Sequence, residues 1–346
     1  MQPIHTLDDF FTRSGASVTL YHMGRRVTPC ARNVLAQFEH ENAAWPDPWQ
    51  GKARLAIMFR LGDIAEPAIW FLALSLDELG QIDPAPRDAF LQRLLETLGH
   101  NVSQVGRNDT QQIDNLMKDN PLVFTPSLSF QAIMHARASH DLAQPASQHL
   151  ELVEAYVSRQ QELDWQALGL QGLADFVIHM DTAAEQQLAE RLPSLPEPVL
   201  HSLCYCLEHV APGETLMAAL RVRGEQAAQA GDIETLCCCV RAVGGTDHPA
   251  TGEWFDNLLA DNAACGPDLL AAIAARGWEH LEDAERLPCF LECLAKEPRS
   301  DFAAVVRDLA SIPRLRLPVV MCLRDAHASS ATKAKLTELS APSSRM

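Results

Sequence analysis

Histidines and cysteines come closest to a metal-binding pattern near residue 205. Four side chains of types that bind zinc occur there within nine residues: His201, Cys204, Cys206 and His209. The apolar residues around them predict a helix, on which positions two apart diverge by about 200°. Four ligands on one helix cannot surround one ion, so a second helix would have to contribute, and Cys237–Cys239 are the nearest candidates. Because free cysteine is among the most buried residue types, we interpret the group as core packing and predict no metal site.

A second cysteine pair has helical spacing. Cys289 and Cys293 lie four residues apart, which places them on one helical face and could supply half of a metal site. No other Cys or His pair flanks them at ligand spacing, which favours small apolar side chains that face a neighbouring helix. Most of the ten cysteines lie among Leu and Val in helical patterns, unlike the polar loops of a secreted disulfide framework. We therefore expect reduced thiols and a cytoplasmic protein.

Catalytic signatures are missing from the sequence. It has no Gly-x-Ser-x-Gly elbow, phosphate-binding loop, dinucleotide fingerprint or His-Glu-x-x-His motif. His135 and His140 flank Arg137, and Asp141 follows, so an acid/base cluster is conceivable; a solvated helix end explains these residues as well. We predict no catalytic residue and no cofactor.

Basic and aromatic residues near the N-terminus are the candidate interaction residues. Arg25 and Arg26 occupy a predicted turn, while Arg54 and Arg60 lie on one face of a predicted strand, opposite its apolar residues. That face could bind an anionic group or be an ordinary solvated sheet face. The tryptophans of the Trp45–Trp49 segment, which contains two prolines, either cover the small core or present an aromatic anchor to a partner. The interaction set is therefore Arg25, Arg26, Arg54, Arg60, Trp45 and Trp49.

Charge is concentrated in the middle of the chain. The formal net charge is −17, and residues 141–285 hold 24 acidic side chains against 6 basic ones. A field of this sign repels nucleic acid and anionic membrane surfaces. The acidic side chains form either a solvated surface or a docking face for a basic protein partner. No run of about 18 uncharged apolar residues occurs, so no membrane span is predicted.

The spacing of apolar residues predicts an α+β chain. Residues 1–98 alternate in strand-like fashion at 17–21, 53–60 and 68–76 and show helical stripes elsewhere, which predicts a small antiparallel sheet with helices. Pro29 predicts a helix start, since proline suits a first turn. Residues 99–127, rich in Gly, Asn, Ser, Gln and Asp, predict a loosely packed linker.

Beyond residue 128, helical stripes follow one another up to 325. Taken in pairs they recur about every 35–40 residues, which is typical of HEAT-like arrays. We favour an irregular solenoid, with a compact helical bundle as the alternative. The tail at 326–346, rich in Ser, Ala and Lys, predicts disorder.

Several short motifs carry a family resemblance. They are Met23-Gly24-Arg25-Arg26, Trp49-Gln50-Gly51, Ile69–Leu72, Leu76-Asp77-Glu78-x-Gly80, Pro86-Arg87-Asp88, Trp278 and Ile312–Leu315. On these residues the chain resembles an uncharacterised bacterial family catalogued only as a domain of unknown function. The resemblance implies a bacterial cytoplasmic setting and no particular activity, cofactor or site residue.

These observations predict a non-enzymatic interaction module or adaptor that recruits a protein through an acidic helical array; if the array is a docking face, that partner is basic. The alternative is an enzyme of unknown reaction with a site in the cleft between the two domains. Nucleic-acid binding by the arginines is the weakest reading. The sequence leaves the oligomeric state open.

Overall fold

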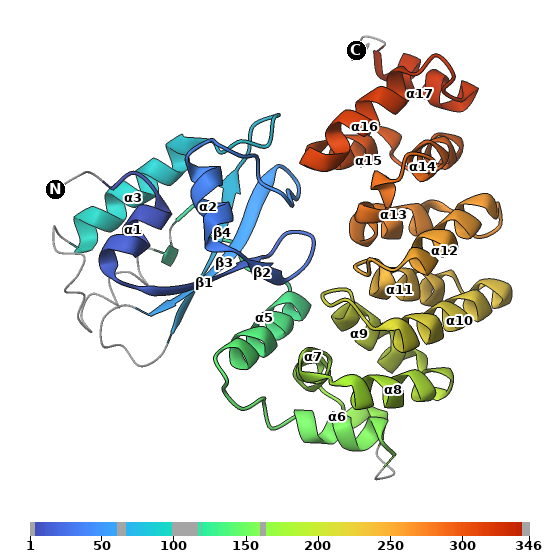
Figure 1. Ribbon diagram of the computed structural model, residues 1–346, viewed down its shortest axis with the longest axis horizontal. Coiled ribbons are helices and arrows are strands. Elements are labelled where there is room, and N and C mark those ends of the chain that lie inside the picture. The colour runs from blue at the N-terminus through green and yellow to red at the C-terminus, as the bar shows by residue number, and fades with distance from the viewer. Residues whose placement is uncertain (1–3, 61–66, 99–116, 119, 160–163, 341–346) are drawn as a thin grey trace. The chain divides into compact units, whose positions relative to one another are not determined.

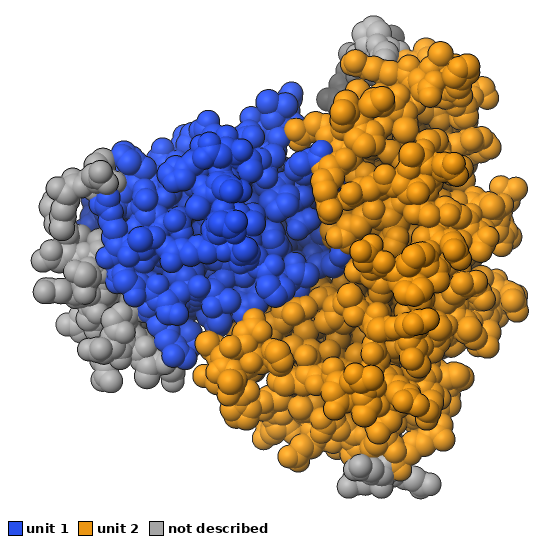
Figure 2. All heavy atoms as spheres, in the orientation of Figure 1, with its two compact units in different colours: residues 1–127, 311–313 blue, residues 128–310, 314–346 orange. Residues whose placement is uncertain are grey.

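The computed structural model describes residues 4–60, 67–98, 117–118, 120–159 and 164–340. The chain divides into two compact units: residues 1–127 with 311–313, and residues 128–310 with 314–346 (Figure 2). The division therefore falls between Ser127 and Leu128. Each unit has its own architecture and is described by itself.

Unit 1 is built on a four-stranded antiparallel sheet. Its strands are β1 (Ser17–His22), β2 (Thr28–Cys30), β3 (Lys52–Arg60) and β4 (Ala68–Ser75), in the spatial order β2-β1-β3-β4 (Figure 1). In the β3–β4 register Leu55 faces Leu72 and Ile57 faces Trp70. These cross-strand pairs place large apolar side chains on one face of the sheet. The predicted β3–β4 turn lies largely at 61–66, outside the described residues.

Three helices cover that apolar face. They are α1 (Leu7–Ser14), α2 (Arg32–Glu39) and α3 (Pro84–Leu98). Phe10 of α1, Phe38 of α2 and Phe90 of α3 join Ile57 and Trp70 in one buried cluster. The small antiparallel sheet with helices is confirmed as an α+β arrangement.

The start of α2 differs from the sequence prediction. Pro29 does not open a helix; it lies in β2 and pairs with Tyr21. β2 is an edge strand of the sheet. Proline, which lacks a backbone N–H, is tolerated at an edge because one side of the strand has no neighbouring strand to bond. The helix begins only at Arg32.

Part of the predicted linker belongs to the sheet. Residues 99–116 and 119 lie outside the described residues, but the Ala73 N–H donates to Leu122 O at 2.7 Å and the Phe124 N–H donates to Phe71 O at 3.2 Å. Val123 bridges Leu72 in antiparallel sense. The prediction of loose packing is wrong for this stretch. The outer edge of β4 carries backbone groups that need partners, and the segment supplies them.

Unit 2 is helical. Its helices are α5 (Leu128–Asp141), α6 (Leu150–Val157), α7 (Leu170–His179), α8 (Thr182–Arg191), α9 (Glu197–Leu207), α10 (Glu214–Ala230), α11 (Ile233–Val243), α12 (Pro249–Ala260), α13 (Pro267–Arg276), α14 (Arg286–Lys296), α15 (Phe302–Ser311), α16 (Pro313–Arg324) and α17 (Ser330–Ser340). Short 3₁₀ turns at Trp165–Ala167, Leu192–Ser194 and Trp278–Glu282 join some of them.

The helices of unit 2 stack in two rows (Figure 1). In the odd row, α5, α7, α9, α11 and α13 each pack on the next. In the even row, α6 packs on α8 and α8 on α10, while α12 packs on α14. The helices α8, α10, α12 and α14 begin at residues 182, 214, 249 and 286, which are 32 to 37 residues apart. Each pair thus contacts mainly its neighbours, as in a helical solenoid.

A glycine lets α10 approach α12. A Cβ on Gly224 would lie 2.9 Å from the ring of Trp254 and 3.1 Å from the Cβ of Cys239. Trp254 is 1% exposed, so its indole fills the space that a side chain at 224 would need. Any larger residue at 224 would push the two helices apart.

The C-terminal tail is also helical. Residues 330–340 form α17, which packs on α14. The Thr332 N–H donates to the Ser329 hydroxyl at 3.2 Å, and Thr332 is buried. The predicted disorder is therefore wrong for these residues, while 341–346 lie outside the described ones. A polar segment without its own apolar stripe is held here by a cap and by tertiary packing, neither of which is visible in its composition.

Candidate interaction surface

The arginines of the predicted turn are buried. Arg25 is fully buried; its Nε–H donates to Pro48 O at 3.1 Å and its guanidinium lies 5.1 Å from the centre of the Trp49 ring. Arg26 is 9% exposed. Neither side chain presents its charge on an open surface, so this turn is not an exposed basic patch.

Arg54 and Arg60 share a face of β3 that is not solvated along its length. Arg54 is half-buried, donates to Gln50 Oε1 at 3.0 Å and lies 5.3 Å from the Phe124 ring. Arg60 is exposed at the strand end. Ala56 and Met58, between them on the same face, are buried. The prediction of an open solvent face is therefore wrong for the middle of this strand.

The two tryptophans differ in role. Trp45 is fully buried, with its ring 5.1 Å from those of both Phe38 and His22. Trp49 is half-buried beneath Arg25. Trp45 thus covers the core of unit 1, the first of the two alternatives, and is not an exposed anchor.

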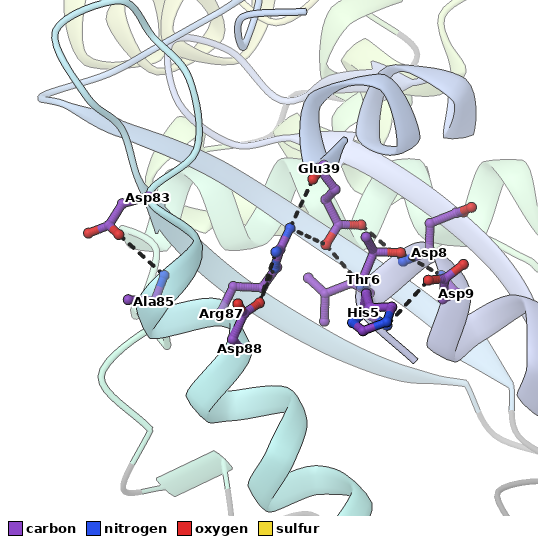
Figure 3. Close-up of polar contacts among 10 residues, drawn as sticks. His5, Thr6, Asp8, Asp9, Glu39, Asp83, Ala85, Arg87 and Asp88 are labelled. Atoms are coloured by element: carbon purple, nitrogen blue, oxygen red, sulfur yellow. Dashed lines mark hydrogen bonds and ion pairs between the residues drawn. The ribbon is translucent and has the colours of Figure 1, made fainter. Parts of the chain in front are cut away.

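A buried carboxylate ties α1, α2 and α3 together (Figure 3). Glu39, the last residue of α2, accepts the backbone N–H groups of Leu7 at 2.8 Å and Asp8 at 3.0 Å, at the start of α1. Arg87 of α3 lies 3.8 Å from its carboxylate and donates to its backbone oxygen at 3.1 Å. Arg87 also pairs with Asp88 at 2.8 Å. Because Glu39 contacts both the start of α1 and Arg87 of α3, the cluster holds α1 in place.

Burial raises the pKa of Glu39 to about 7, against the lowering effect of the Leu7 and Asp8 N–H groups and of Arg87. Glu39 is not among the candidate residues that its sequence pattern predicts. Its signal is a glutamate beside Phe38 and four positions after Leu35, on the apolar side of a short helix.

The acidic residues of the middle segment are mostly exposed. Among those at 141–285 that the structure describes, seventeen are exposed and two, Asp175 and Glu208, are buried. On α9, α11 and α13 of the odd row the exposed ones lie in first turns: Glu197, Glu234 and Asp268. Acidic side chains are favourable at helix N-termini, which explains their position on each helix. Because these helices stack in sequence, their first turns recur along the row.

A groove runs across the odd row beside the first turns of α11 and α13. It has a volume of about 490 Å³ and is shared by α9, α11 and α13. We call it the odd-row groove and define it by Tyr205, Glu234, Cys237, Cys238, Arg241, Asp268 and the alanines Ala271 and Ala275. Tyr205 is 38% exposed, an unusual degree for an aromatic ring in a packed array.

Inside the odd-row groove the phenol of Tyr205 and the thiols of Cys237 and Cys238 are neutral near pH 7. Burial first, and then the Cys238 thiol, raise the pKa of Tyr205 to about 12. Burial likewise raises the pKa of Cys237 to about 12 and that of Cys238 to about 11. Phenol and thiols therefore keep their protons and are poor nucleophiles. The arrangement is suited to binding.

Arg241 is fixed at the groove by a buried clamp. Its guanidinium lies 5.2 Å from the centre of the Tyr205 ring, and its Nε–H donates to Glu208 Oε2 at 2.8 Å. The other carboxylate oxygen of Glu208 lies 2.8 Å from Nε of Arg276. Glu208 follows α9, Arg241 is on α11 and Arg276 ends α13. One carboxylate thus links the three helices that form the groove.

The histidines and cysteines near residue 205 contact different partners and do not converge on one point. His201 Nε2 lies 2.8 Å from the Thr235 hydroxyl, and the Cys204 side chain interacts with that of Cys239. All ten cysteines are free. Within the described ranges no three His, Cys, Asp or Glu side chains are placed to hold a metal ion.

The residues considered as an acid/base cluster do not converge. The His140 ring lies 5.2 Å from that of His179 and 3.2 Å from Asp141. Arg137 donates instead to the backbone oxygen of His209 at 2.6 Å. His140 and Asp141 are largely at the surface of the last turn of α5, in keeping with the solvated helix end.

The molecule is thus an α+β protein in which a small sheet unit precedes a two-row helical array with a groove on one row. The chain matches the model of the family described as a protein of unknown function (DUF3549) over residues 2–340, and it belongs to that family. Comparison with curated proteins and with solved structures finds no match. In the described part of the chain, no helix combines the length and apolar character needed to cross a membrane.

Proposed function

We propose that this protein is an interaction module of a bacterial cytoplasm, whose helical array is a HEAT-like solenoid that recruits a protein partner. The odd-row groove would take a partner segment that carries Lys or Arg. The single observation that carries the proposal is the groove itself, which combines an exposed tyrosine and two neutral thiols with acidic residues at its edge. The ten free cysteines support a reducing compartment.

The chemistry of the groove favours a short basic and apolar segment. Ala271 and Ala275 leave room for a side chain of the partner next to Tyr205, since they are small and lie on one face of α13. Tyrosine supplies contact area at a low entropic cost. Glu234 and Asp268 are exposed carboxylates within reach of a lysine or arginine at the edge. Arg241, held by Glu208, would donate hydrogen bonds to a carbonyl oxygen or to the terminal carboxylate of the same segment.

Charge reversal at the edge tests this function. The double variant Glu234→Lys/Asp268→Lys should weaken capture of a specific protein from native lysate at least tenfold, because an attractive edge becomes repulsive. Capture by the unaltered protein should also fall between low and moderate salt, since the edge charges are solvated. Tyr205→Ala should reduce capture without changing its salt dependence.

Glu214→Lys is the matched control. Glu214 is an exposed first-turn glutamate like the other two, but it begins α10 of the even row. Its reversal changes the helix dipole and the net charge as much as each single reversal at the groove edge does. Because Glu214 lies outside the groove, capture should stay within about twofold of the unaltered protein. Equal capture by the edge variant and the control, in quantitative mass spectrometry of the bound fraction, would dismiss the groove as the binding site.

A further inference from the structure

Three cysteines of unit 2 line one pocket, away from the odd-row groove. Cys265 lies in the turn between α12 and α13, while Cys289 and Cys293 lie one helical turn apart on α14. The pocket has a volume of about 760 Å³. Cys289 is exposed, and the other two are half-buried. The turn and the helix are brought together by the packing of α12 on α14.

Two of these thiols interact. Cys265 and Cys293 both line the pocket, and each side chain shifts the pKa of the other. The Cys293 thiol also donates to Leu259 O at 3.3 Å. Cys289 is the most exposed of the three.

The interaction makes the two sulfurs unequal. The Cys265 side chain, and then Lys296 on the next turn of α14, outweigh burial and lower the pKa of Cys293 to about 7. Its partner's pKa is raised by the same interaction and by burial. Glu292, Glu297 and Asp261 are the carboxylates that act on the pair. Thiolate character follows such pairing, so Cys293 is the better nucleophile.

A second thiol pair in the same unit shows what the pocket adds. The side chains of Cys204 and Cys239 also interact, but both are 0% exposed between α9 and α11. Neither sulfur has an opening to solvent, and the interaction with Cys239, followed by burial, raises the pKa of Cys204. The two pairs share this interaction and differ in access.

We propose that Cys265 and Cys293 form a peroxide-reactive dithiol that closes to a disulfide between the α12–α13 turn and α14. The pocket gives a small neutral oxidant a route to both sulfurs. Its edge carries several carboxylates, including Asp283, Glu285 and Glu297. Their negative charge repels anionic oxidants, such as small disulfides that carry carboxylates. Hydrogen peroxide is the oxidant class that fits this edge.

The reaction balances with hydrogen peroxide alone. The Cys293 thiolate attacks one oxygen, so that an S–O bond forms, the O–O bond breaks, and the departing hydroxide takes a proton to become water. The Cys265 sulfur then attacks the Cys293 sulfur; the S–S bond forms, the S–O bond breaks, and the second hydroxide leaves as water with the Cys265 proton. Two thiols are oxidised and one peroxide is reduced to two waters.

Mass spectrometry of the full-length protein tests this site. The reduced protein, freed of reductant and treated with one equivalent of hydrogen peroxide, should lose the mass of two hydrogens. Trypsin cuts after Arg241, Arg276, Arg286 and Lys296, so Cys265 and Cys293 fall in separate peptides. The expected product is these two peptides joined through Cys265 and Cys293, with Cys289 still a free thiol.

Single variants separate the roles. Cys289→Ser should form the same cross-link at a rate within about twofold of the unaltered protein. Cys265→Ser should stop at the sulfenic acid of Cys293, which dimedone labels, and circular dichroism checks its fold. The buried Cys204 and Cys239 should stay reduced in every sample. If exposure alone governed oxidation, Cys289 would react first; that order, or a cross-link through Cys289, would overturn the proposal.

Discussion

Each unit of this protein buries a glutamate, and the two units satisfy it in opposite ways. Glu39 in unit 1 accepts two backbone N–H groups of α1, and its nearest guanidinium is 3.8 Å away. Glu208 in unit 2 has Arg241 at 2.7 Å and Arg276 at 2.8 Å. The first carboxylate completes the start of a helix, whereas the second connects three helices of successive pairs.

The difference follows from how each unit forms its core. In unit 1, α1, α2 and α3 all pack into one buried cluster with the sheet. A short helix such as α1 then needs hydrogen-bond partners only for the free backbone N–H groups at its start. In unit 2 each helix pair contacts mainly the adjacent pairs, and side-chain ties can add to packing between neighbours. The buried glutamate therefore fixes the start of one helix in unit 1, whereas in unit 2 it links successive helices along the array.

The largest expected effect is at Glu208. Glu208→Ala leaves two guanidinium groups without their shared carboxylate, and loss of one partner of a buried pair costs about 3–5 kcal/mol. Urea denaturation followed by circular dichroism measures it. Glu225→Ala removes a half-exposed partner of Arg221 on the even row and should cost less than about 0.5 kcal/mol. Similar losses for both variants would mean that Glu208 is no clamp.

A smaller effect is expected from the pH response of Glu39. Because its pKa is raised from 4.5 to about 7, the folded protein binds the proton more tightly than the unfolded chain does. The stability from the protonated carboxyl is complete below pH 4.5 and is lost as the pH rises through 7. Its loss is on the order of 2–3 kcal/mol.

Comparison with Glu39→Gln isolates that response, since glutamine stays neutral at every pH. The difference in unfolding free energy between the two proteins should move in favour of the variant from pH 5 to pH 8. Hydrogen exchange of the Leu7 and Asp8 amides, corrected for the intrinsic effect of pH, locates the change at α1. A pH-independent difference would contradict the raised pKa.

The smallest effects are expected at two helix caps. The Thr6 hydroxyl accepts the Asp9 N–H at 2.9 Å in unit 1, and Asp232 accepts the Thr235 N–H at 3.0 Å in unit 2. Thr6→Ala and Asp232→Ala should each cost about 1 kcal/mol. Thr6→Ala should couple to Glu39→Gln by more than about 0.5 kcal/mol, because both act on the first turn of α1. Asp232→Ala and Glu208→Ala, at opposite ends of their contacts with α11, should be additive in the same assay.

Much of the fold could be predicted from local pattern. The alternation of Leu55, Ile57 and Phe59 identifies β3, and Thr6 and Gly15 mark the ends of α1, because these signals act within a few residues. The same approach failed at Pro29, where an edge position in the sheet decided the outcome, and at α17, where packing on α14 did.

The candidate sites were harder to predict for the same reason. Arg25 and Trp45 are of residue types that often anchor a partner at an exposed surface, yet the fold buries both. Tyr205 and Asp268 are 63 residues apart and meet in one groove only through the stacking of α9, α11 and α13. Spacing along a chain reports one helix face at a time, so it cannot show a surface that three helices share.

By itself, the sequence determined where most of the strands and helices form, that the middle of the chain is acidic, and that successive helices recur as pairs. These properties depend on periodicity and composition. The tertiary structure decided which charges are buried, which thiols interact and where a groove opens. Those properties depend on contacts between residues far apart in sequence, whose burial and distance set the energy of every charge and hydrogen bond.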